Sequence, residues 1–295
     1  MRIVLGLEYC GTAYFGWQSQ VGGRTVQDAL ERALCGIAGE PIRVICAGRT
    51  DTGVHARSQV VHFDTSADRP DSAWVKGVNT HLPHDIAVQW AVRTQEDFHA
   101  RFSATSRRYE YWLLNRTVRP AIGADTLGWY HHALDLALMR AAAVHLQGEH
   151  DFSAFRSAQC QAKSPVRNMT QLDIARHGDV LQFTFEANAF LHHMIRNIVG
   201  SLVYVGNRKH PPEWLANVVA SRTRALAAPT FSPAGLYLSA IRYDARWGLP
   251  SPAPRLAPMA HLVPGMPVVA EEPVVPLVAL VPPMPAPSVA RGELA

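Results

Sequence analysis

A short polar loop gathers the residues with the clearest chemical potential. Residues 47–56 read AGRTDTGVHA and lie between two apolar runs, 42–46 and 59–63, that are typical of strands. Arg49 precedes Asp51 by two positions, and a nearby guanidinium keeps a carboxylate ionised by lowering its pKa. Such a carboxylate suits a nucleophile or a charge stabiliser better than a general acid. A solvated turn, in which Asp51 caps its own backbone, is the alternative that composition leaves open.

Arg196 is the second candidate for catalysis. The pattern of residues 191–205 predicts a helix whose polar side carries His192, His193, Arg196 and Asn197. From there Arg196 could reach Asp51 and balance its charge. An ordinary surface ion pair is the alternative for an arginine in such a position.

Asp51 also starts a D-T-G tripeptide, which is the signature of aspartic proteases. That chemistry needs two carboxylates that share one proton. The chain contains one D-T-G, so a protease site would have to form across a homodimer. Because three-residue matches are often fortuitous, an aspartic hydrolase is the weaker enzyme hypothesis.

The sequence predicts neither a metal site nor a bound cofactor. The four cysteines form no C-x-x-C pair. The adjacent pairs His131-His132 and His192-His193 are expected to point apart on a helix or strand, which is poor for shared ligation. No G-x-S-x-G elbow and no Walker or Rossmann glycine pattern occurs.

Cysteine usage and hydropathy indicate the cytoplasm. Cysteines without a disulfide pattern fit a reducing compartment. No run of about 18 apolar residues occurs without charges or helix breakers, so no membrane-spanning helix is expected. The apolar start of the chain is too short before Glu8 for a secretory signal.

Basic residues recur on connectors and helix ends, which favours a polyanionic partner. The formal net charge is +4. Arginines around a shared site could grip phosphates, although each alone could equally be a solvated surface residue. The set comprises Arg101, Arg107, Arg108, Arg208, Lys209, Arg222 and Arg224.

The surrounding pattern predicts an α+β protein made of two similar α/β halves. Each half reads as strand, helix, strand, strand, helix, strand. The halves could join edge to edge into one mainly antiparallel central sheet flanked by helices. The active-site cleft would then lie between them, lined by the Asp51 loop and the Arg196 helix.

The predicted elements follow the chain in order. In the first half we expect strand 3–9, helix 26–38 with Thr25 as its N-cap, helix 73–82 and strand 86–92. The second half should hold strand 109–114, helix 136–146, a hairpin of 166–174 with 180–186, helices 191–205 and 212–220, and strand 236–243.

Three segments follow from this order. Residues 1–105 should form the half that carries the Asp51 loop. Residues 106–249 should form the half that carries Tyr109 and Arg196. Residues 250–295 hold 12 of the 21 prolines and are expected to be a disordered tail without a role in chemistry.

Seven segments form an ordered set of motifs. They are GRTDxGVHA at 48–56, EYxGxxYxGWQ at 8–18, FHARFSA at 98–104, RYxY at 108–111, GxHDFSxF at 148–155, AFLHHMIRN at 189–197 and GLYL at 235–238. Taken together, these segments resemble the tRNA pseudouridine synthase A family. The similarity extends over about residues 2–249, and the ordered set makes it specific. Position 52 is threonine where alanine is usual in the family, and position 10 is cysteine where aspartate is common.

The resemblance implies an isomerase that acts on tRNA. Such an enzyme converts uridine to pseudouridine in the anticodon stem-loop at positions 38, 39 and 40, works as a homodimer and needs no cofactor. A protein of the same fold that binds RNA without catalysis is the alternative of another class.

The resemblance also assigns roles to residues. Asp51 would be the catalytic nucleophile and Arg196 its basic partner. Tyr109 would stack on the target base, and Arg49 would help to hold the flipped nucleotide. The expected substrate-binding set is completed by Leu236, Arg101, Arg107 and Arg108.

Overall fold

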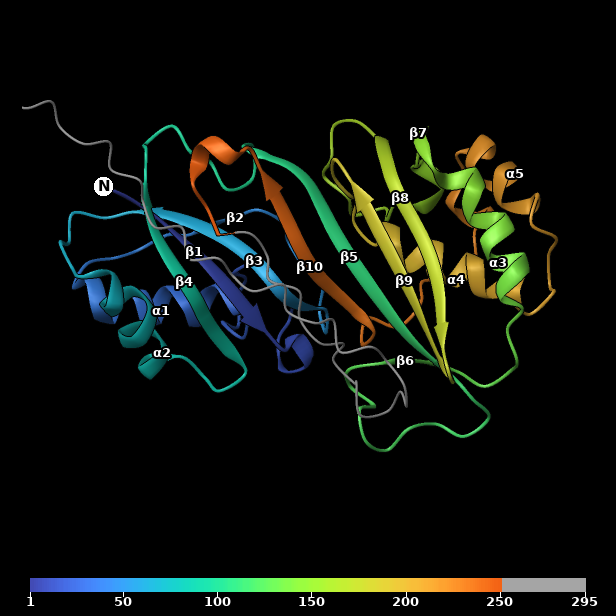
Figure 1. Ribbon diagram of the computed structural model, residues 1–295, viewed down its shortest axis with the longest axis horizontal. Helices are drawn as coiled ribbons and strands as arrows, with labels where there is room; N and C mark the ends of the chain where they lie inside the picture. The colour runs from blue at the N-terminus through green and yellow to red at the C-terminus, as the bar shows by residue number, and fades with distance from the viewer. Residues whose placement is uncertain (251–295) are drawn as a thin grey trace, which may run out of the picture.

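One continuous sheet runs through the described chain, residues 1–250 of the computed structural model (Figure 1). Its strands are β1 (Arg2–Tyr9), β2 (Ile45–Cys46), β3 (His55–Asp64), β4 (Ile86–Thr94), β5 (Ala104–Asn115), β6 (Gly128–Tyr130), β7 (Gly148–Asp151), β8 (Val166–His177), β9 (Val180–Ala187) and β10 (Leu236–Tyr243).

The two halves of the sheet meet where a late strand pairs with an early one. The strand order is β4-β1-β3-β10-β5-β9-β8-β7, with β2 beside β3 and β6 beside β5. β10 runs parallel to β3, at Tyr237 and Leu238, and antiparallel to β5. The remaining pairs are antiparallel except β5 with β6. The expected α+β fold with a mainly antiparallel sheet is confirmed.

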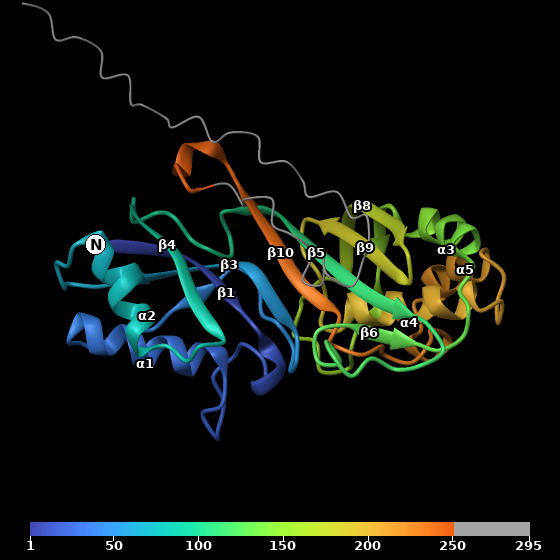
Figure 2. The ribbon, with the colours of Figure 1, turned by 60° about the horizontal axis from the view of Figure 1, so that its bottom comes forward.

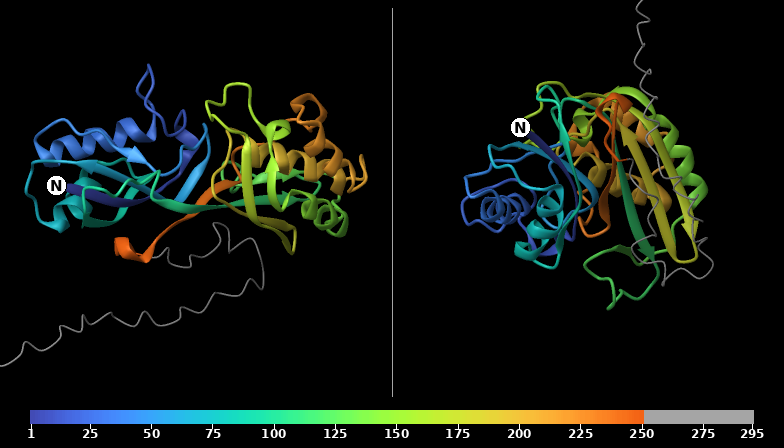
Figure 3. Two further views of the ribbon diagram at one scale, coloured as in Figure 1. Left: turned by 90° about the horizontal axis from the view of Figure 1, so that it is seen from above. Right: turned by 60° about the vertical axis from the view of Figure 1, so that its left-hand side comes forward.

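Helices flank the sheet at both ends. They are α1 (Val26–Ala38), α2 (Val78–His81), α3 (Leu136–Ala143), α4 (Met194–Gly206) and α5 (Trp214–Ser221). Figure 2 shows α1 and α2 on the first half and α3 to α5 on the second. α1 and α4 lie on the same face of the sheet, as the view from above makes clear (Figure 3).

The sequence signals at the ends of α1 operate as expected. The Thr25 hydroxyl accepts a hydrogen bond from the backbone N–H of Asp28, which satisfies one of the free donors of the first turn. At the other end Gly39 takes φ 76° and donates its N–H to the Cys35 carbonyl. The apolar face of the helix is buried on the sheet.

Buried apolar side chains form one large cluster that spans both halves. It includes residues of β1, β3 and α1 in the first half and of β5, β9 and α4 in the second. A smaller cluster lies apart from it and consists of Trp112, Leu114, Leu127, Val180 and Tyr237. The two halves therefore share one hydrophobic core around the sheet.

Several predicted boundaries are wrong. The helix expected over 191–205 begins at Met194, because His193 takes the left-handed φ of 63° and interrupts it. The strand expected over 42–46 is reduced to Ile45–Cys46, whereas β3 starts as early as His55. Residues 148–151, where no helix or strand was predicted, form β7. Residues 73–77 form a π-helical turn ahead of α2, so the helix predicted there is irregular.

The segment limits at residues 105 and 249 stay predictions. The expected tail lies outside the described residues, apart from Pro250. Within residues 1–250 no helix combines the length and the apolar composition that crossing a membrane requires.

Gly16 should be a sensitive point of this fold. Gly16 and Gly23 both have left-handed φ values, 84° and 62°. A Cβ on Gly16 would lie 2.8 Å from the Thr50 carbonyl oxygen, whereas nothing lies within 4 Å at Gly23. Gly16→Ala should therefore lower the free energy of unfolding by about 1–3 kcal/mol more than Gly23→Ala, because it adds overpacking to the shared backbone strain. Equal losses in urea unfolding would contradict this.

Candidate active site

Hydrogen bonds from the first half of the chain hold the Asp51 loop in place. The backbone N–H of Trp17 donates to the Thr50 carbonyl at 3.0 Å. The Thr50 hydroxyl lies 2.8 Å from the Tyr9 hydroxyl in a buried hydrogen bond. The next residue, Asp51, turns its side chain away from this support, with 19% of the side chain exposed. These hydrogen bonds fix the backbone of the loop next to the Asp51 carboxylate.

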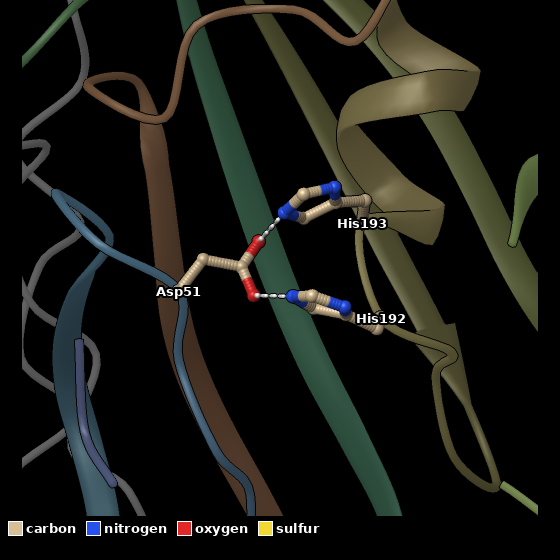
Figure 4. A group of neighbouring side chains, drawn as sticks. All are labelled: Asp51, His192 and His193. Carbon is tan, nitrogen blue, oxygen red and sulfur yellow. Dashed lines mark ion pairs between the residues drawn. The ribbon is translucent and has the colours of Figure 1, made fainter. Parts of the chain in front are cut away.

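Three basic side chains from the second half surround that carboxylate. Arg196 Nη1 lies 3.2 Å from Asp51 Oδ2. His192 Nε2 lies 3.3 Å from Oδ1, and His193 Nε2 lies 3.6 Å from Oδ2. Figure 4 shows both imidazole rings facing the carboxylate from the turn before α4. The structure therefore brings Arg196 to Asp51, as the sequence led us to expect.

His192 and His193 overturn one expectation. Neighbouring residues on a helix or strand point apart, but these two rings lie side by side with centroids 4.0 Å apart. They lie in a turn closed by the bond from Met194 N to the Leu191 carbonyl, and His193 has φ 63°. The left-handed residue turns both side chains toward Asp51. A His-His pair in the sequence carries no signal for such a backbone angle.

Arg196 is fixed in place by the backbone as well as by Asp51. Its Nε donates to the Phe231 carbonyl at 2.8 Å, and the Phe231 N–H donates to the Arg196 carbonyl at 3.2 Å. Its side chain is 14% exposed. A guanidinium bound on two sides loses little further freedom when it meets a ligand.

The surroundings of Asp51 keep it ionised. Burial alone raises the pKa of the carboxyl, but the hydrogen bond from His192 and the charges of His193, His192 and Arg196 outweigh it and lower the pKa below its usual value. Burial also lowers the pKa of His193 below its usual value, so its ring is mostly neutral at pH 7. Arg196 supplies the positive charge that remains at any physiological pH. An aspartic hydrolase would need a second carboxylate here; the charged neighbours of Asp51 in the described chain are cations.

Tyr109 lies beside the loop on β5. Its ring meets Phe190 edge to face at 5.1 Å. A Cβ on Gly48 would lie 3.5 Å from the Tyr109 hydroxyl, which places that hydroxyl against the start of the loop. Burial raises the pKa of Tyr109 far above its usual value, with a further contribution from the charge of Asp51. The hydroxyl is therefore neutral at physiological pH.

The four predicted arginines separate into two groups. Arg49 and Arg101 are exposed. Arg107 is buried, and its guanidinium donates to the carbonyls of Ala47, Arg101, Ala104 and Asn188.

Arg108 points to the opposite face of β5, where it pairs with Glu186 at 3.0 Å and donates to Gln171. The structure does not bring the guanidinium of Arg107 or of Arg108 to Asp51.

Leu236 and His55 lie where β10 pairs with β3 and β5, next to the site. Leu236 is buried at the start of β10, opposite Tyr111. The His55 ring accepts from the Gly11 N–H at 3.0 Å through Nδ1, and its Nε2 lies 3.0 Å from the Ala234 carbonyl. One neutral tautomer satisfies both bonds. His55 therefore braces the loop against β10 instead of joining the reactive group.

Comparison with known proteins agrees on one family. Residues 7–103 and 142–244 match a family described as tRNA pseudouridine synthase. A tRNA pseudouridine synthase A from Dechloromonas aromatica (strain RCB) is 57% identical over 252 residues, which are 85% of this chain and 96% of that protein. One from Polaromonas naphthalenivorans (strain CJ2) is 58% identical over 255 residues, 85% and 97% of the two chains.

Among solved structures, a chain from the crystal structure of a Cbf5-Nop10-Gar1 complex covers 68% of this chain and 45% of its own length. The identity is 11% and the TM-score 0.32, a similarity too weak to bear on fold or function.

Asp51 should make the free energy of unfolding depend on pH in the acidic range. Its pKa is lower in the folded chain than in the unfolded one, so its ionised form contributes stability that is complete above about pH 4 and is lost as the pH falls through the folded-state pKa. Asp51→Asn removes this titration. The free energy of unfolding of the wild type minus that of Asp51→Asn should therefore fall as the pH drops below about 4, as urea unfolding can measure. Asp97→Asn, at an exposed carboxylate, is the control. A flat difference for Asp51 would contradict the lowered pKa.

Proposed function

Because the chain belongs to the tRNA pseudouridine synthase A family and is thus an isomerase, we propose that it converts uridine to pseudouridine in the anticodon stem-loop of tRNA, at positions 38, 39 and 40. Asp51 is the catalytic nucleophile in this proposal. The observation that carries it is the position of the Asp51 carboxylate, 3.2 Å from Arg196 of the opposite half of the chain, in surroundings that lower its pKa.

The reaction needs a carboxylate in its charged form. The N-glycosidic bond of uridine breaks, the uracil rotates within the site, and a carbon–carbon bond forms between C5 and the sugar. Asp51 can serve by attack on C1′, by addition to C6 of the uracil, or by removing a proton from the sugar. Each of these steps uses an oxygen lone pair, so each requires the ionised carboxylate, which the neighbouring cations maintain against the effect of burial.

In this proposal Arg49 and Tyr109, which is 7% exposed in the free chain, hold a base outside its stack. A base in a stem-loop must be extruded before Asp51 can reach its sugar, which costs a few kcal/mol. Stacking on an aromatic ring returns about 1–3 kcal/mol, and Tyr109 lies against the catalytic loop. Arg49 is exposed two residues from Asp51, where a cation can bind the phosphate of the extruded nucleotide.

The remaining predicted residues divide between substrate and scaffold. Arg101 is exposed and available to the RNA backbone. Arg107 binds the Ala47 carbonyl at the start of the loop, so its role in the proposal is to hold that loop. Arg108 forms an ion pair with Glu186 on the opposite face of β5. Leu236 is buried at the start of β10.

The homodimer and the cytoplasmic location belong to the same proposal. The homodimer follows from the family resemblance, and the cytoplasmic location follows from the cysteine usage and hydropathy of the sequence. Light scattering of the purified protein would measure the oligomeric state.

Asp51→Asn should abolish product formation while the protein still binds tRNA. Bond formation at C5 displaces the C5 hydrogen, so tritium released from tRNA that carries 5-³H-uridine measures turnover. Loss of the nucleophile should lower the rate by at least about 10³-fold, because an amide has no anionic oxygen. Asp97→Asn is again the control. Wild-type turnover in Asp51→Asn would end the proposed mechanism, and tRNA binding without product in the wild type would favour the RNA-binding alternative.

Arg49→Gln should lower catalytic efficiency, whereas Arg107→Gln should lower stability. Arg49→Gln removes an exposed cation and should lower kcat/KM with a stability change within about 0.5 kcal/mol. Arg107→Gln leaves buried carbonyls without donors and should lower the free energy of unfolding by about 1–3 kcal/mol. Parallel turnover and urea-unfolding measurements separate the two. If Arg49→Gln unfolded as easily as Arg107→Gln, Arg49 would be a structural residue.

A further inference from the structure

The side chains around the carboxylate form a donor set that fits a transition metal ion. A carboxylate and two imidazoles each offer one ligand atom, and these atoms all lie within 4.8 Å of one another. In a tetrahedral zinc site, with bonds of about 2.0–2.1 Å, neighbouring ligand atoms lie about 3.3–3.5 Å apart. His192 Nε2 lies 3.3 Å from Asp51 Oδ1, and His193 Nε2 lies 3.6 Å from Asp51 Oδ2. Each imidazole is thus close to this spacing from a different oxygen of the carboxylate. Figure 4 shows the two imidazole rings side by side, each facing one of the two carboxylate oxygens.

The backbone holds these donors in place before any ion binds. The carbonyl of His192 accepts from the Ser157 N–H at 3.0 Å, and its N–H lies 3.5 Å from Cys160 Sγ. His193 precedes α4 with φ 63°. The side chains of Asp51, His192 and His193 are 19%, 33% and 28% exposed, so an ion can enter without unfolding the turn.

We propose that Asp51, His192 and His193 bind a divalent transition metal of the Zn²⁺ class, and that the bound ion inhibits the isomerase. Imidazole nitrogen and carboxylate oxygen are the ligands that such ions prefer. Three protein ligands leave a fourth position for water. The inhibition rests on the proposed function, in which Asp51 is the nucleophile: a metal ion on the carboxylate withdraws its negative charge and lowers its nucleophilicity.

Arg196 sets the strength of this site. Its Nη1 is 3.2 Å from Asp51 Oδ2, and a fixed positive charge so close repels a divalent cation. Replacing it with a neutral residue should therefore tighten metal binding, an effect that adventitious binding elsewhere on the surface would not show.

Calorimetric titration of the full, untagged chain with ZnCl₂ tests the site without RNA. His192→Gln and His193→Asn should each weaken binding at least tenfold, and Arg196→Gln should strengthen it. Asparagine tolerates the left-handed backbone of position 193, and thermal unfolding of each metal-free variant shows whether it is folded.

The matched control is the pair His131 and His132, whose rings also lie 4.0 Å apart and are exposed. His131→Asn/His132→Asn should leave the affinity unchanged. If His192→Gln and His193→Asn bound Zn²⁺ like the wild type, the site would be refuted.

Turnover measurements then test inhibition separately. Zn²⁺ should stop tritium release at the concentration that saturates the calorimetric site, and EDTA should restore the full rate. Calorimetric binding with undiminished turnover would refute the inhibitory role alone. Absence of turnover in EDTA-treated wild type would instead contradict the proposed function, and the calorimetric result would still decide the metal site.

Discussion

The pairing of Asp51 with Arg196 is the constraint on which the rest of the structure depends. The two residues are 145 positions apart in the chain and meet at 3.2 Å. A partly buried carboxylate without a cation would take up a proton or lose stability. The continuous sheet solves this problem, because β10 joins β3 to β5 and fixes the two halves at one distance. An interface with freedom to slide could not hold an ion pair at that length.

Local backbone strain completes the arrangement. His193 holds a left-handed φ that costs a non-glycine residue of the order of 1–3 kcal/mol. The packing of α4 and the bonds around the preceding turn compensate for it. In return, two successive imidazoles face one carboxylate. The same geometry that tunes Asp51 for chemistry creates the donor set that fits a metal ion.

The arginines show how one residue type serves two purposes in this protein. Arg107 donates hydrogen bonds to four backbone carbonyls near the site, and Arg108 forms an ion pair with Glu186. Both stabilise the platform. Arg49 and Arg101 remain exposed, so their charge is available to a polyanion. Sequence position alone, with Arg107 and Arg108 adjacent, does not distinguish these roles.

The sequence by itself determined the elements whose signals are local. The Thr25 cap, the period of α1 and the Gly39 stop are short-range features, and they predicted that helix closely. The order of strand-like and helix-like segments predicted the α+β sheet, and the ordered motifs predicted the family. Tertiary structure alone decided that β10 would lie between β3 and β5, since a parallel pair forms between distant segments. It also decided that His192 and His193 face Asp51 and that Arg107 is buried. These outcomes depend on one backbone angle and on carbonyls contributed from far along the chain, for which a stretch of sequence carries no local signal.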